Sequence, residues 1–276
     1  MGLLTAIRKF RYPVSTDAFN PPLHIKQLAD DLDAWTGNQV MPIVTDASDR
    51  DAKFPSPAQG FAVYRRDLGV VQRYYEAYNA VTNPGGKLVP GWKVEQSGLV
   101  PIRPASAVNA SISSGGLITL SAASSVSVNG CFIPEFENYM IKFNLSGSVS
   151  LLPALRWRAN GVDNTNNTVY YQGHSGQGAS AGAGGAAAVN QIPLLNAASL
   201  NTMDSDMDVY SPQRTRSTRT IAKYFSRNGT SNTGMGTGFI SSEQTDVTSF
   251  DGFTLFPSSG LLSGTIRVYG YSDEVN

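Results

Sequence analysis

The chain contains two histidines, and neither occupies a position that favours chemistry. His24 lies where a helix is expected to begin, and His174 lies within the glycine-rich stretch 173–185. A serine–histidine–aspartate triad or a zinc site needs an imidazole that its surroundings hold in place. A histidine in a glycine-rich loop is poorly preorganised, so we expect neither histidine-based catalysis nor a zinc site.

A run of alternating aspartates resembles part of a calcium-binding loop. Asp204, Asp206 and Asp208 match the first three ligand positions of an EF-hand. Val209 replaces the required glycine, and Thr215 stands where the bidentate glutamate would be. The pattern predicts a solvated acidic turn, and a cation bound in some other geometry stays open as the alternative.

Two glutamates flank a phenylalanine in the middle of the chain. If residues 135–137 form a strand, Glu135 and Glu137 lie on one face about 7 Å apart. Glycosidases use carboxylate pairs at comparable separations. This spacing is also common by chance, so we expect no catalytic residues and no cofactor, and glycan cleavage remains the alternative.

Tyrosines and arginines in two segments could form a saccharide site. Such sites combine exposed aromatic faces with polar groups, and they usually lie on loops of a rigid scaffold. Arginine forks suit anionic cell-wall polymers, although the basic run 214–219 also fits a charged edge strand. We hypothesise that two segments meet at the distal end of the C-terminal domain, although alternation must bury one of the adjacent tyrosines. The candidate contacts are Tyr170, Tyr171, Tyr210, Arg214 and Arg216.

The composition limits the classes of partner and compartment. Charged residues make up 15% of the chain, and 21 basic residues balance 21 acidic ones. Average soluble domains are about 25% charged. Nothing here favours nucleic acid, and no apolar run is long enough to insert into a membrane. Cys131 is the single cysteine, which rules out an intrachain disulfide. We expect its side chain to be buried and to pack as a small apolar group.

Residues 116–276 are expected to form an antiparallel β-sandwich, similar to a jelly roll. Short runs of alternating polarity recur there, and Asn129-Gly130 is a hairpin signal. Glycine is too frequent in stretch 173–185 for a helix or strand, which predicts a long surface loop. The fold class is therefore mainly β. The expected strands are 117–120, 126–128, 139–145, 155–157, 169–171, 221–225, 239–240, 253–256 and 265–271.

Residues 1–44 are expected to form an extended arm followed by a short helix over residues 21–37. Four large apolar residues recur along this helix at the spacing of a packing stripe. A helix this short is marginal alone, so it packs either within its own chain or against copies of itself in a trimer. The stripe is Ile25, Leu28, Leu32 and Trp35.

Residues 45–95 are expected to form a small second module. The polar segment 45–51 predicts a turn, and residues 61–64 and 70–75 predict a β-hairpin. A helix over residues 70–80 is the competing interpretation, because its tyrosines also fit a helical stripe. Residues 96–115 contain few charges and are interpreted as a linker to the sandwich.

Three stretches together resemble bacteriophage minor tail and fibre proteins. The first, Asp49-Arg50-Asp51-Ala52 followed by Phe54-Pro55-Ser56-Pro57-Ala58-Gln59-Gly60 and Gly91-Trp92, resembles a module common in such proteins. The other two, residues 136–143 with 155–162 and the ending 262–271, are similar to the C-terminal sandwich of minor tail proteins from phages of actinobacteria. The resemblance covers most of the chain after residue 45. It supplies no catalytic residues.

The resemblance implies a structural virion protein, often trimeric, that sometimes forms the receptor-binding tip. Its partners would be copies of itself, other virion proteins bound through the N-terminal arm, and host cell-wall glycans. Assembly in the host cytoplasm fits the lack of disulfides. The alternatives are a capsid or collar fibre or decoration protein without a receptor role, and a glycan-degrading tail spike.

Overall fold

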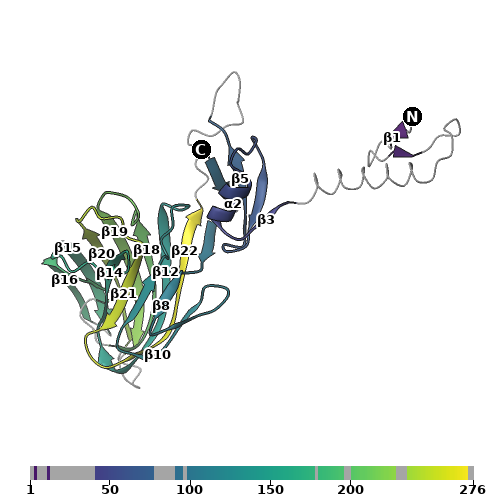
Figure 1. Ribbon diagram of the computed structural model, residues 1–276. Helices are drawn as coiled ribbons and strands as arrows, with labels where there is room; N and C mark the ends of the chain where they lie inside the picture. Colours follow the sequence, from purple (N-terminus) through teal and green to yellow (C-terminus); the bar gives the residue numbers. More distant parts are fainter. Residues whose placement is uncertain are drawn as a thin grey trace.

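The computed structural model describes residues 3–4, 11–12, 41–77, 91–95, 98–177, 180–195, 200–227 and 235–272. Within these ranges the chain is mainly β, which confirms the predicted fold class (Figure 1). β1 (Leu3–Leu4) pairs with β2 (Arg11–Tyr12). The predicted helix with Ile25, Leu28, Leu32 and Trp35 lies outside the described residues, as does His24. No helix in the described ranges is both long and apolar enough to cross a membrane.

Two antiparallel sheets form the C-terminal domain. Along the larger one the strands are ordered β16-β15-β20-β19-β18-β12-β22-β10-β9, and β7 also pairs with β22. Its strands are β7 (Gly98–Ile102), β9 (Ser111–Ile112), β10 (Ile118–Ala123), β12 (Asn138–Leu151), β15 (Val169–Gln177), β16 (Ser180–Val189), β18 (Leu200–Tyr210), β19 (Thr218–Arg227), β20 (Met235–Gln244) and β22 (Leu262–Ser272). The smaller sheet contains β8 (Ser106–Val108), β11 (Val126–Asn129), β13 (Pro153–Ala159), β14 (Val162–Asp163), β17 (Ile192–Pro193) and β21 (Gly252–Pro257).

Alternating side chains of the two sheets meet in one core. Tyr139, Ile141 and Phe143 on β12 are buried, as their alternation with polar residues predicts. Phe143 of the larger sheet contacts Phe253 of the smaller sheet, with ring centroids 6.3 Å apart. This contact across the sheets confirms the predicted sandwich. Its strand number exceeds the roughly eight strands of a jelly roll.

Cys131 lies in this core, as the sequence predicts. Its side chain is fully buried and forms no disulfide. Burial raises the pKa of its thiol, because the charged thiolate would lose its hydration. The cysteine is therefore a structural residue.

The small module contains β3 (Ile43–Val44), α2 (Ala47–Lys53), β4 (Ala62–Arg65), β5 (Val70–Tyr75) and β6 (Gly91–Val94). β4 and β5 form the predicted hairpin, so the competing helix is wrong for residues 70–75. The expected polar turn at residues 45–51 is also wrong, because most of it forms α2. The side chain of Asp46 caps that helix by accepting a hydrogen bond from the Asp49 amide at 2.9 Å.

The described part of the expected linker at residues 96–115, which starts at residue 98, belongs instead to the sandwich. Residues 98–102 form β7, which pairs with β22, and residues 106–112 contribute β8 and β9. Val100 and Ile102 on β7 are buried in the shared core. Their burial overrides the weak local signal of this segment, so the sandwich begins at residue 98 rather than 116.

The glycine-rich stretch is a β-hairpin rather than a loop. β15 and β16 pair with each other, and β15 also pairs with β20 over its whole length. The backbone ladder to β20 stabilises this segment despite its low strand propensity, as tertiary context often does. In Figure 1 the hairpin lies on the side of the sandwich away from the small module.

Candidate functional site

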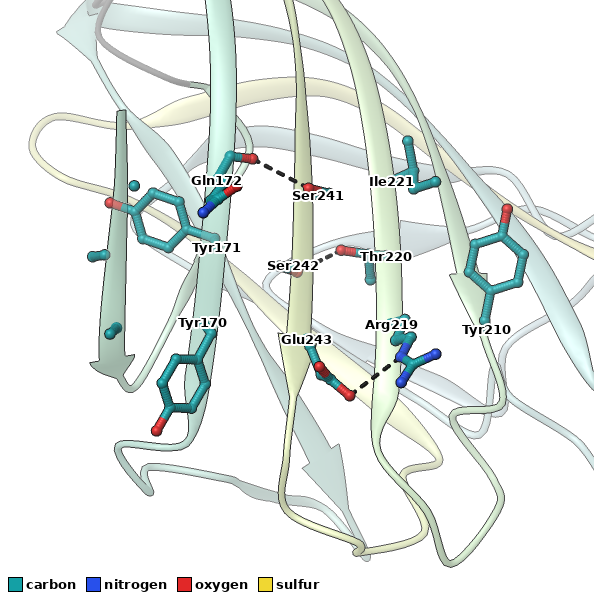
Figure 2. A pocket seen from close by; sticks show the side chains of 13 residues that line it. Tyr170, Tyr171, Gln172, Tyr210, Arg219, Thr220, Ile221, Ser241, Ser242 and Glu243 are labelled. Carbon is teal, nitrogen blue, oxygen red and sulfur yellow. Dashed lines mark hydrogen bonds and ion pairs between the residues drawn. The ribbon is translucent and has the colours of Figure 1, made fainter. Parts of the chain in front are cut away.

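Four residues of the larger sheet form one row across its outer face. Tyr210 on β18 is paired with Arg219 on β19, Arg219 with Glu243 on β20, and Glu243 with Tyr170 on β15. Neighbouring strands are about 4.8 Å apart, so the two tyrosine backbones are separated by roughly 14 Å. Figure 2 shows the two rings on opposite sides of the charged pair.

The charged pair in the centre of the row balances itself. The Arg219 Nε atom lies 3.2 Å from the Glu243 Oε1 atom; the arginine side chain is largely exposed and the glutamate side chain is half-buried. A hydrogen bond from Ser217, with a further contribution from Arg219, lowers the pKa of the Glu243 carboxyl. The carboxylate therefore stays ionised near neutral pH, and the pair presents hydrogen-bonding groups without net charge.

A second row lies next to the first and continues the same face. Ile221 on β19, Ser241 on β20 and Gln172 on β15 are aligned by the strand register. The Ser241 hydroxyl donates a hydrogen bond to the Gln172 carbonyl oxygen at 3.5 Å, and Ile221 is 39% exposed. Gly185 completes the row on β16, where a Cβ atom would lie 2.7 Å from the Tyr171 carbonyl oxygen. Glycine is thus required for β16 to approach β15.

Beneath these rows the inner face of the sheet is tightly packed. The hydroxyls of Thr220 and Ser242 are 2.6 Å apart and form a buried hydrogen bond. Tyr171 points to this side and packs, partly buried, against the core, whereas Tyr170 is 46% exposed. Alternation therefore turns one of the adjacent tyrosines inward, as expected, but leaves it only partly buried.

The two rows line a shallow groove of about 690 Å³ (Figure 2). We call it the tyrosine groove. Aromatic rings stand at its ends, aliphatic and glycine surface forms part of its floor, and an ion pair, an amide and hydroxyls supply polar contacts. Such a surface can bind a ligand whose faces are apolar and whose edges carry hydroxyl groups. Its lining residues are Tyr170, Tyr171, Gln172, Gly185, Ala186, Ala187, Tyr210, Arg219, Thr220, Ile221, Ser241, Ser242 and Glu243.

Three of the five predicted contact residues meet in this groove, and two do not. Tyr170, Tyr171 and Tyr210 line it. Arg214 and Arg216 lie in the turn between β18 and β19 and face Glu137 instead. The Arg216 Nη2 atom is 2.6 Å and the Arg214 Nη2 atom 3.9 Å from that carboxylate.

Sequence reasoning missed Arg219 and Glu243. Arg219 belongs to the basic run 214–219, but only this arginine enters β19, where it pairs with Glu243. Burial alternates strictly over residues 218–227 and places Arg219 and Ile221 on one face, but both faces mix polar and apolar residues, so the sequence offered no alternation that would have predicted it. Glu243 carried no signal either.

The expected pair of glutamates on one strand face is wrong. Residues 131–137 form turns rather than a strand. Each carboxylate is engaged by a different arginine: Glu135 lies 2.7 Å from the Arg65 Nη1 atom, and Glu137 pairs with Arg216. The chain reversal needed before β12 overrides the alternation expected for this segment.

The three aspartates also differ from their prediction, because they lie on strand β18 rather than in an acidic turn. Each contacts a polar group on another strand of the same sheet, β12 for Asp204 and Asp206 and β22 for Asp208. Lys142 lies 3.2 Å from Asp206, Asn144 donates to Asp204 at 2.5 Å, and the Tyr271 hydroxyl donates to Asp208 at 2.5 Å. In the described part of the chain no three histidine, cysteine or acidic side chains gather as a metal site would require.

His174 lies on β15 with its ring against Phe239, 5.1 Å between centroids. The expected position of this histidine in a glycine-rich loop is therefore wrong.

No known protein family matches this chain, and a search of curated proteins also finds no match.

Proposed function

We propose that this protein is a structural, non-enzymatic component of a bacteriophage particle, and that it attaches to host-surface glycan through the tyrosine groove. The observation that carries the binding proposal is the row in which Tyr170 and Tyr210 flank the Arg219–Glu243 pair. Aromatic faces stack on the apolar side of sugar rings. The charged pair, the Gln172 amide and the Ser241 hydroxyl offer partners to the sugar hydroxyls.

The charge balance of the groove favours a neutral glycan over an anionic polymer. Arg219 is the one cation among the described lining residues, and Glu243 neutralises it at 3.2 Å. The arginines that could favour a phosphate-containing polymer, Arg214 and Arg216, face Glu137 outside the lining. An anionic ligand would have to displace a carboxylate to reach Arg219.

The arrangement of carboxylates supports binding rather than cleavage. Glycoside hydrolysis commonly uses two carboxyl groups on opposite sides of the scissile bond. Glu243 is the single carboxylate among the described residues that line the groove. The pair considered from the sequence, Glu135 and Glu137, is divided between Arg65 and Arg216.

The virion assignment rests on the resemblance of the motifs in order along the chain. In this proposal the N-terminal arm attaches to other virion proteins, and the stripe of Ile25, Leu28, Leu32 and Trp35 holds three copies together. The exposed aromatic groove is the feature that favours an attachment role over a capsid or collar fibre without one. Mass measurement at micromolar concentration should give a trimer, and a well-folded monomer would contradict this part.

The binding proposal is tested with the purified full chain on an array of neutral and anionic glycans. Wild type should bind neutral glycans, and Tyr170→Ala and Tyr210→Ala should each weaken binding about threefold to tenfold, the value of a lost aromatic contact. Tyr64→Ala is the matched control, because Tyr64 is 37% exposed but lies in the small module. Absence of binding, or equal loss in the control, would contradict the proposal. Release of oligosaccharides that Glu243→Gln abolishes would favour the tail-spike alternative.

A further inference from the structure

We propose that the tyrosine groove is one end of a longer binding surface whose ligand is a linear, neutral glycan chain. The bound glycan runs along strands β15 and β20 to a second aromatic subsite at Phe239 and His174. This inference rests on the proposed glycan binding and adds to it the form of the ligand, its direction, and a site for its distal units.

The second subsite is a separate hollow on the same face of the sheet. It has a volume of about 430 Å³ and lies over β15, β16 and β20. Phe239 is 47% exposed, and its ring is inclined 32° to that of His174. Small residues form the rest of the lining, so the ring pair stands beside open, low surface. They are Ser175, Gly176, Ala181, Gly182, Ala183, Thr237 and Gly238.

The strand register places both hollows on one outward face. β15 and β20 are paired without a bulge from Val169 to Gln177, so every second residue faces the same way. Tyr170, Gln172 and His174 therefore follow one another on β15, opposite Glu243, Ser241 and Phe239 on β20. From Tyr170 to His174 the strand rises by roughly 13 Å, which a single sugar ring cannot bridge but several linked sugars can.

The surface between the hollows has the polar groups that a continuous chain would need. Gln172 and Ser241 lie midway, in the register position between the Tyr170–Glu243 and His174–Phe239 pairs. The order along the strands is thus ring, amide and hydroxyl, then ring. This alternation suits a ligand whose successive units each present an apolar face and hydroxyl edges.

The same order argues against a second copy of this chain as the occupant. A self-association face would be apolar in its centre, with charges depleted there. Here the Arg219–Glu243 pair and the Gln172 amide stand between Tyr210, Tyr170 and Phe239, so close packing of another protein would desolvate the ion pair. A hydrated saccharide leaves these groups their hydrogen bonds.

The experiment measures how affinity depends on ligand length. The full-length protein is titrated calorimetrically with cello-, malto-, manno-, xylo- and chito-oligosaccharides of two to six units. In the series that binds, affinity should rise with length and then level off. Phe239→Ala should leave the disaccharide affinity within about twofold of wild type and weaken the longest chain about threefold to tenfold. Tyr170→Ala should weaken every length.

Phe225→Ala is the matched control, since Phe225 is 64% exposed on the same sheet but lines neither hollow. Equal loss for Phe225→Ala and Phe239→Ala would overturn the assigned path, as would affinity that does not depend on length. Sedimentation velocity of wild type and Phe239→Ala should agree, and a lower mass for the variant would identify a self-association face instead. Failure of all five series to bind would instead contradict the proposed glycan binding itself.

Discussion

Arg65 should couple the small module to the sandwich. Its guanidinium, almost fully buried, donates to Asp67 at 2.6 Å within the module. It also donates to Glu135 at 2.7 Å, in the segment that leads into β12, and to the Gln72 side chain at 3.3 Å. The perturbation is a pair of substitutions, Arg65→Met and Glu135→Gln, made separately and together. Methionine retains the apolar volume of the arginine stem without its charge.

The expected magnitude follows from the burial of the two partners. Burial by itself lowers the pKa of Arg65, but hydrogen bonds with Asp67 and Glu135 raise it above its ordinary value, so the arginine stays charged. Removing one partner of a buried pair costs about 3–5 kcal/mol. Glutamine at position 135 keeps a neutral acceptor, and Asp67 remains, so Glu135→Gln should cost about 1–2 kcal/mol. Arg65→Met should cost about 3 kcal/mol because it leaves the carboxylates of Asp67 and Glu135 without their buried partner, whereas Gln72 keeps its hydrogen bond from Arg50 at 2.6 Å.

Urea unfolding of the wild type, the two single variants and the double variant gives the coupling free energy between Arg65 and Glu135. We expect about 1–2 kcal/mol, since neighbours in one hydrogen-bonded network are not additive. The same cycle for Lys142 and Asp206, an exposed pair at 3.2 Å, is the control and should give under about 1 kcal/mol. A coupling for Arg65 and Glu135 no larger than that of the control would refute the reasoning.

Two further predictions concern packing and pH. Gly270→Ala places a Cβ atom 2.3 Å from the Phe136 ring, so it should lower the free energy of unfolding by about 1–3 kcal/mol, measured by thermal denaturation. The control, Gly115→Ala, has open space around the added Cβ atom and should change this free energy by under about 0.5 kcal/mol. A hydrogen bond from the Thr248 side chain is the main cause that lowers the pKa of Asp246 below its ordinary 3.8. The unfolded state therefore binds more protons as pH falls below about 4, so the stability that Asp246 contributes is present above this pH and lost below it. Acid unfolding of Asp246→Asn should show a shallower dependence on pH in that range, and an unchanged slope would contradict the assignment.

The sequence predicts most reliably those strands that have one buried face. On β12, Tyr139, Ile141 and Phe143 alternate with polar residues, so the inward face follows directly from the period of a strand. Residues 169–171 were predicted as a strand and begin β15, but the prediction failed for the glycine-rich remainder of β15 and for β16, where glycine and alanine remove both the alternation and the propensity. Those strands depend on their ladder with β20, which is distant in the sequence, and no local pattern contains that information.

The candidate site was predicted in part for the same reason. Tyr170 and Tyr210 were predicted as candidate contacts, although the sequence did not decide whether Tyr170 or Tyr171 is exposed, and the register of four strands brings them to one row. The prediction that Arg214 and Arg216 line the site was wrong, because both lie before the start of β19 and pair with Glu137. Which arginine of a basic run enters a strand depends on where the turn ends, and turn boundaries are the least certain part of a sequence-based prediction.

Strand β19 leaves apolar side chains on the outer face that carries the tyrosine groove. Ile221 and Phe225 point outward and alternate with three cations, Arg219, Lys223 and Arg227, while Thr218, Thr220, Ala222, Tyr224 and Ser226 are buried. A one-residue shift in register would bury the three cations and expose Tyr224, so folding favours the observed register. That register places Ile221 beside the Arg219–Glu243 pair, where it lines the groove. In the proposed function, the ligand would cover this exposed apolar side chain.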